Sequence, residues 1–161
     1  MKSEQAKLVV ALATYHEPQH NGHRLNARFR GAIELIRNEH GAEVILEEWW
    51  FRPEPSFAST LQDATMKWEN VGTPDEPRFE TSTACLNYHP PTYDPTKPSP
   101  REYGPLVAQE LREAYMVGRI NQCMNSYKVG LFIVGLAHLH SMLIKLRAAG
   151  FEVKGYSWMG E

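Results

Sequence analysis

The sequence predicts an α/β fold, in which a mainly parallel central sheet of about four strands is flanked by helices. Continuous apolar runs at 8–13, 44–46 and 129–134 are typical of strands that are covered on both faces. Segments with helical periodicity lie between these runs, and strands that alternate with helices usually form a parallel sheet. Because the chain has 161 residues, 42% of them hydrophobic, we expect a single domain over 1–161.

The first part of the chain carries two of these strands and the helix between them. The strand at 8–13 ends where a polar run begins. An apolar stripe at helical spacing then predicts a helix over 22–40, and Gly41 suits its C-terminal cap. The next strand, 44–46, stops at two consecutive glutamates, and residues 56–70 could hold a further helix.

The second part begins with a long proline-rich segment. Residues 72–104 contain seven of the eleven prolines, so we expect a functional or disordered loop there and not a second core. Pro105 suits the first turn of a helix that runs to about Asn125. The third buried strand is followed by a helix that ends near Ala149, and residues 151–156 alternate as in an edge strand.

Composition excludes several classes of function. Lysine and arginine number 17 and the acidic residues 19, with no basic block, which disfavours nucleic acid as a partner. No apolar run is long enough for a membrane span or forms a signal-peptide core, and Cys85 and Cys123 form no CxxC pair, so we expect a cytoplasmic protein with reduced thiols. Because GxGxxG, P-loop and GxSxG motifs are absent, we expect no nucleotide cofactor and no nucleophile-elbow hydrolase.

Polar side chains gather where the three predicted strands end. The first strand is followed by His16 and Glu17, the second by Glu47 and Glu48, and the third by His138. The carboxyl ends of parallel strands meet at one edge of a sheet, where α/β proteins bind ligands. Side chains alternate along a strand, so at most one of the two glutamates can enter a cleft at this edge.

Two kinds of chemistry suit these residues. His16, Glu48 and His138 would form a two-histidine, one-carboxylate site of the kind that binds Zn, Fe or Mn. Either histidine could instead act as a general base, and a helix N-terminus beside His138 would keep that ring neutral. The HExxH match at 16–20 is not a zincin motif, because it follows a strand and contains a proline, although His20 could still lie near the cleft.

The helix after the loop carries candidate binding residues. Arg112, Met116 and Arg119 lie on one helical face, at i, i+4 and i+7. Two guanidinium groups on one face could bind a carboxylate, a phosphate or a developing oxyanion, or Arg112 could pair with Glu48 as a structural contact. Trp49 flanks the site and could pack on a flat ligand.

The same residues resemble a known superfamily. The strand ending in His16, the strand ending in glutamate, the run REAYMVGRI at 112–120 and the run IVGLAH at 133–138 are similar to a pattern in the erythromycin-esterase-like, ChaN-like and TraB/TIKI proteins. The resemblance covers 8–48 and 105–156. It implies hydrolase or protease chemistry, in some members metal-dependent, with His16, Glu47 or Glu48, Arg112 and His138 as functional residues. An ungapped alignment favours Glu48.

Two functions are therefore expected. The first is hydrolysis of an ester or amide bond in a small molecule, with or without a bound metal. The alternative is a non-catalytic ligand-binding or regulatory module that uses the same cleft. The short chain and the absence of a glycine in the turn at 13–16 favour the alternative. In that case the proline-rich loop would bind a partner or join two copies of the chain as a homodimer.

Overall fold

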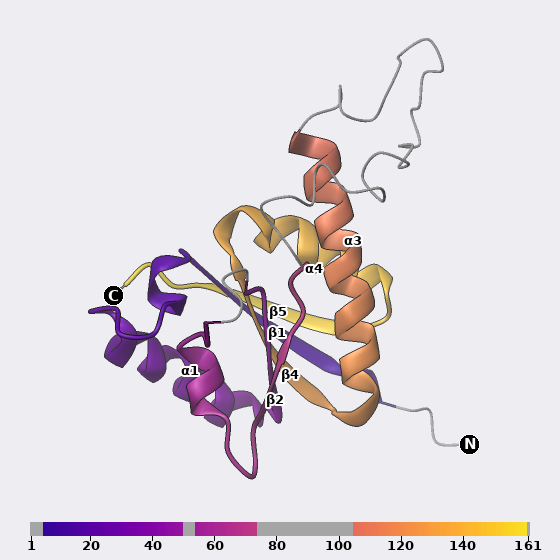
Figure 1. Ribbon diagram of the computed structural model, residues 1–161. Helices are drawn as coiled ribbons and strands as arrows, with labels where there is room; N and C mark the ends of the chain where they lie inside the picture. Colours follow the sequence, from indigo (N-terminus) through magenta and orange to yellow (C-terminus); the bar gives the residue numbers. More distant parts are fainter. Residues whose placement is uncertain (1–4, 50–53, 74–104, 161) are drawn as a thin grey trace.

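The computed structural model describes residues 5–49, 54–73 and 105–160, with side chains on the last range from Gln109 onward. Apart from its first two residues, the predicted proline-rich loop at 72–104 lies outside this part of the chain. The described residues form one parallel sheet with helices on both faces, which confirms the predicted α/β fold (Figure 1).

The sheet has five strands within the described ranges, in the order β3-β2-β4-β1-β5, and every pair is parallel. The strands are β1 (Leu8–Thr14), β2 (Val44–Glu47), β3 (Lys67–Asn70), β4 (Val129–Gly135) and β5 (Glu152–Ser157). β1 and β4 lie in the middle and are almost wholly buried, as their unbroken apolar runs predict. β5 lies at an edge, as its alternating sequence predicts.

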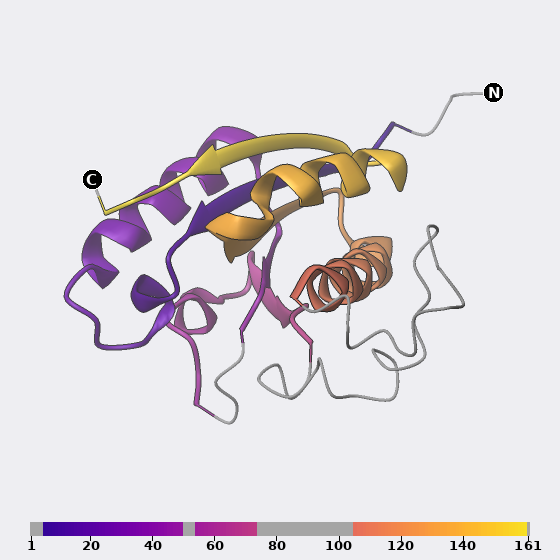
Figure 2. The same ribbon diagram turned by 90° about the horizontal axis from the view of Figure 1, so that it is seen from above.

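The helices divide the core into two layers. The helices are α1 (Asn26–His40), α3 (Pro105–Cys123) and α4 (Leu139–Ala148). On one face of the sheet, Phe29, Ile33 and Ile36 of α1 pack against alternate residues of β1, β2 and β4. On the other face, α3 and α4 cover the intervening residues of the same strands. Figure 2 shows α1 on one side of the sheet and α3 and α4 on the other.

The segment at 56–70 differs from the expected helix. It forms a short 3-10 turn, η2 (Ala58–Leu61), and then the edge strand β3. β3 is only partly buried and pairs with a single neighbour, β2, so it needs no apolar run of its own. The helix expected from residue 22 begins at Asn26, because residues 21–25 form turns around Gly22, whose φ is 87°.

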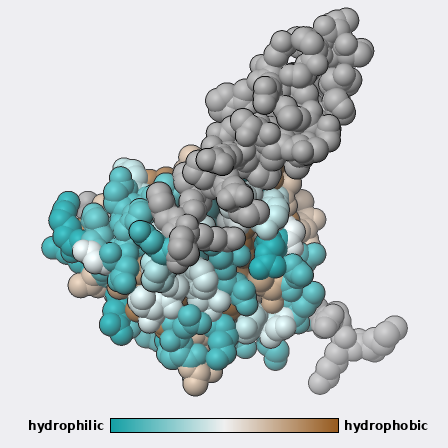
Figure 3. Space-filling model, in the orientation of Figure 1, coloured by the Kyte–Doolittle hydropathy of each residue, from teal (hydrophilic) through white to brown (hydrophobic). Residues whose placement is uncertain are grey.

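The register of the central strands brings three strand ends to the same edge of the sheet. Thr14 at the end of β1 lies beside Gly135 at the end of β4, and the backbone N–H of Glu48 donates to the carbonyl of Ile133 at 2.9 Å. The residues that follow β1, β2 and β4 therefore emerge side by side. The visible surface of the described residues is largely hydrophilic (Figure 3), and none of their helices is long and apolar enough to cross a membrane.

Candidate active site

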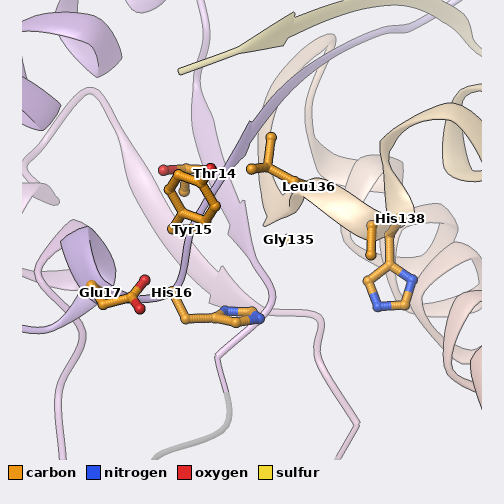
Figure 4. Close-up of a pocket in the computed structure, with 8 residues that line it drawn as sticks. Thr14, Tyr15, His16, Glu17, Gly135, Leu136 and His138 are labelled. Atoms are coloured by element: carbon orange, nitrogen blue, oxygen red, sulfur yellow. The ribbon is translucent and has the colours of Figure 1, made fainter. Parts of the chain in front are cut away.

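A pocket of about 400 Å³ lies where β1 and β4 end. Of the residues predicted for the strand-end site, His16, Glu17 and His138 line it. The full lining is Thr14, Tyr15, His16, Glu17, Gly135, Leu136, Ala137 and His138. In Figure 4 the rings of His16 and His138 lie on either side of Gly135, the first from the end of β1 and the second from the 3-10 turn η6 (Leu136–His138).

Glu48 is buried beneath this pocket and faces His138. One carboxylate oxygen, Oε1, accepts a hydrogen bond from the backbone N–H of Gly135 at 3.0 Å. The other, Oε2, lies 3.5 Å from His138 Nε2. Only 1% of the Glu48 side chain is exposed, so its carboxylate oxygens meet protein groups and not bulk water.

His16 meets Glu48 at Gly135. A Cβ placed on Gly135 would lie 3.3 Å from Glu48 Oε1 and 3.3 Å from His16 Nε2. Glycine therefore leaves just the space that lets both side chains approach the end of β4. The structure places Glu48 beside His138 and brings both Glu48 and His16 to the end of β4, the edge at which the strand-end pattern expects them.

A buried acid on α3 orients His138. Glu113 Oε2 lies 2.8 Å from His138 Nδ1, and Glu113 Oε1 accepts from Lys145 Nζ at 2.7 Å and from the Ser141 hydroxyl. Burial alone would raise the pKa of Glu113, but hydrogen bonds from His138, Lys145, Ser141 and Gln109 outweigh it and lower this pKa from 4.5 to about 2. Glu113 is therefore ionised, so His138 carries its proton on Nδ1 and turns Nε2 toward Glu48.

Glu47 lies on the opposite face of β2, so its predicted place in the cleft is wrong. Its carboxylate accepts hydrogen bonds from Trp68 Nε1 at 2.8 Å, Gln19 Nε2 at 3.0 Å and the Ser56 hydroxyl. Complete burial raises the pKa of Glu47 from 4.5 to about 7, against the lowering effect of these three bonds. The alternation of side chains along β2 separates the two glutamates into different roles.

The predicted anion-binding face of α3 does not form as a unit. Met116 is 1% exposed and packs in the core, which corrects its assignment as a ligand-binding residue. Arg119 donates to Gln122 Oε1 at 2.7 Å, and it lies about 10 Å along the helix from Arg112. Arg112 is half-buried and directly precedes Glu113, which places it on the helix that supports His138.

His20 and Trp49 pack against each other outside the pocket lining. Their rings make an edge-to-face contact with centroids 5.1 Å apart, and Trp49 Nε1 donates to the carbonyl of Glu54 at 2.7 Å. Trp49 is 2% exposed, so its expected role in ligand binding is wrong and packing accounts for it. The segment between His16 and His20 is the 3-10 turn η1 (Glu17–Gln19), which agrees with the exclusion of a zincin helix.

Sequence reasoning missed Glu113 and Gln19. Glu113 had a signal, because it lies on the same helical stripe as Met116 and Ile120, where a carboxylate must find a buried partner. Gln19 had none, since a glutamine after a proline in a turn is an ordinary surface residue.

The donor types in this site suit a divalent metal only in part. Two imidazoles and a carboxylate are common ligands, and the 3.5 Å between His138 Nε2 and Glu48 Oε2 is close to the roughly 3.4 Å that separates two ligands of a tetrahedral metal. Within the ranges that the structure describes, however, no group of three or more such side chains converges to hold an ion.

No known protein family, curated protein or solved structure matches the chain. The superfamily resemblance therefore depends on the residues quoted for it, and the function on the geometry of the site.

Proposed function

We propose that the chain is a hydrolase of ester- or amide-type bonds in small molecules and a short member of the erythromycin-esterase-like, ChaN-like and TraB/TIKI superfamily. One observation carries the proposal: His138 is held through Nδ1 by an ionised carboxylate, while its Nε2 faces Glu48 across 3.5 Å beside a pocket. An imidazole fixed in this way is oriented for proton transfer.

In the proposed reaction His138 acts first as base and then as acid. A water molecule hydrogen-bonded to both His138 Nε2 and Glu48 Oε2 would attack the carbonyl carbon and give its proton to Nε2. The imidazolium is stabilised by Glu113 and Glu48, and it returns the proton to the leaving alcohol or amine as the C–O or C–N bond breaks. His16 positions the substrate from the opposite side of Gly135. Arg112 is the proposed stabiliser of the oxyanion, as the resemblance implies.

The test is turnover on a panel of p-nitrophenyl esters and amino-acid p-nitroanilides by the full chain. Each substrate is offered with chelator and with added Zn²⁺, Fe²⁺ or Mn²⁺. Hydrolysis above the rate of the His138→Ala variant supports the proposal. Saturable binding of the same compounds without turnover would overturn it and establish the alternative, a ligand-binding module.

A bound metal is the alternative form of the proposal, in which the Nε2 lone pair of His138 binds the ion instead of accepting the proton of water. His16, Glu48 and His138 would then hold one Zn, Fe or Mn ion, which would polarise a carbonyl and lower the pKa of water. We expect about one metal per chain in protein purified without chelator, lost when His16 and His138 are replaced by alanine. Elemental analysis measures this directly, and a metal content equal in wild type and double variant would contradict the ligand assignment.

Substituting Gly135 tests the contact at the end of β4. Its φ of −63° accepts alanine without backbone strain, but the new methyl would press on Glu48 and His16. We expect Gly135→Ala to reduce kcat/KM by about 10-fold or more while costing less than about 1 kcal/mol in stability.

The matched control for this substitution is Gly31→Ala on α1, where a Cβ meets no atom within 4 Å. This change should leave turnover unchanged and add roughly 0.5–1 kcal/mol of stability through helix propensity. Equal activity of the two variants would show that Gly135 does not shape the site.

A further inference from the structure

Gln19 is a buried polar residue behind the site, and its side-chain amide makes three close polar contacts. Its side chain is completely buried. The amide nitrogen donates to Glu47 Oε2 and to the backbone carbonyl of Glu48, both at 3.0 Å. The amide oxygen lies 2.9 Å from His16 Nδ1.

These contacts fix which way the Gln19 amide points. Rotating the amide by half a turn would place its oxygen against a carboxylate and a carbonyl, which are both acceptors. The nitrogen must therefore face Glu47 and the Glu48 carbonyl, and the oxygen must face His16. The carbonyl has no proton to gain or lose, so it holds this orientation whichever ionisation state Glu47 adopts.

The oxygen of Gln19 in turn requires a donor on His16. An amide oxygen can only accept, so His16 Nδ1 must carry a proton. In a neutral ring the lone pair is then on Nε2, the atom that approaches Gly135 on the side of Glu48. A neutral histidine side chain in water prefers the opposite tautomer, with the proton on Nε2.

We propose that Gln19 is a positioning residue that holds His16 in the Nδ1–H tautomer, with Glu47 and the Glu48 carbonyl anchoring the Gln19 amide. This deepens the proposed function, because it makes Nε2 of the neutral His16 ring an acceptor or ligand at the site. It also assigns roles to the adjacent glutamates. Glu48 faces His138, and Glu47, on the other face of β2, supports His16 through Gln19.

The carboxylate of Glu47 is itself fixed in place by hydrogen bonds. Its Oε1 accepts from Trp68 on β3 and from Ser56, whose hydroxyl also accepts the backbone N–H of Ser59 at 3.0 Å. The chain of bonds therefore runs from the edge strand β3 through Glu47 and Gln19 to His16. Each bond in it has one donor and one acceptor, which leaves a single tautomer for the neutral His16 ring.

The test is the tautomer of His16 in the full, ¹⁵N-labelled chain without substrate, at about pH 8. Long-range ¹H–¹⁵N correlation spectra distinguish protonated from unprotonated ring nitrogens, and the His16→Ala variant identifies the signals. In the wild type we expect protonated Nδ1 and unprotonated Nε2. A wild-type His16 with its proton on Nε2 overturns the proposal, whatever the variants do.

One variant tests the cause. Gln19→Leu removes the acceptor of the His16 Nδ1 proton, so we expect the Nε2–H form of His16 to become the majority. Ser56→Ala is the control, because it removes a partner of Glu47 without touching Gln19, and the tautomer should stay as in the wild type. An unchanged tautomer in folded Gln19→Leu would overturn the proposal. These spectra do not depend on hydrolysis, so failure of the proposed function is detected separately.

Discussion

Replacing His138 by alanine is expected to lower kcat/KM for ester or amide hydrolysis by at least about 100-fold, the usual contribution of a positioned general base. The ring is the group that both accepts the water proton and returns it to the leaving group. Its removal also takes away the ring that bridges Glu48 and Glu113. His138 Nε2 lies 3.5 Å from Glu48 Oε2, and His138 Nδ1 lies 2.8 Å from Glu113 Oε2. Kinetics on any substrate that the wild type turns over measure the effect.

His140→Ala is the matched control. His140 lies two residues further along, on α4, and is exposed. Its replacement should leave kcat/KM within a factor of about two, as expected for a surface position. If His138→Ala retained wild-type activity in a folded protein, the proposed proton transfer would be wrong.

Glu113→Ala is expected to destabilise the protein by about 3 kcal/mol, because it removes the common acceptor of a buried network. His138 Nδ1, Ser141 and Lys145 all bond to this carboxylate, whose side chain is 1% exposed. Chemical denaturation measures this loss of stability. The same substitution also releases His138 from its fixed orientation.

Glu110→Ala separates this effect from the loss of a simple ion pair. Glu110 bonds to the same Lys145 at 2.8 Å, but its side chain is 47% exposed, so its removal should cost less than about 1 kcal/mol. Equal destabilisation by the two variants would contradict the view that Glu113 is the centre of the network.

The pKa of Glu113 also gives stability a defined dependence on pH. Its value in the folded chain is about 2, against 4.5 ordinarily, so between these limits the unfolded chain binds more protons than the folded one. The stabilisation is therefore complete above about pH 4.5 and is lost as the pH falls toward 2. The difference in stability between wild type and Glu113→Gln should shrink over this range in acid titrations of unfolding.

The central part of the fold could be predicted because burial on both faces leaves a strong pattern. β1 and β4 are continuous apolar runs, and the polar residues that follow them mark the edge of the candidate site. The parallel arrangement then follows from the alternation of strands and helices. This is why the sequence could predict that His16, Glu48 and His138 lie at the same edge of the sheet.

The rest could not be predicted because it depends on contacts distant in the sequence. β3 is stabilised by pairing with β2 and not by its own composition. Gln19 acquires its role only when β2 places Glu47 and the Glu48 carbonyl beside it, 28 and 29 residues away. The alternation rule could show that the two glutamates face opposite ways, but only the packing of α3 and α4 determines which one meets His138.

The most direct test of the central claim is the turnover of the His16→Ala/His138→Ala double variant, compared with the two single variants and the wild type. If the two histidines act with Glu48 as one site, each single variant should lose most of the activity, and the double variant should lose little more than the worse of them. Circular dichroism confirms that all four chains are folded. A folded double variant that hydrolyses the same substrates at the wild-type rate would contradict the account.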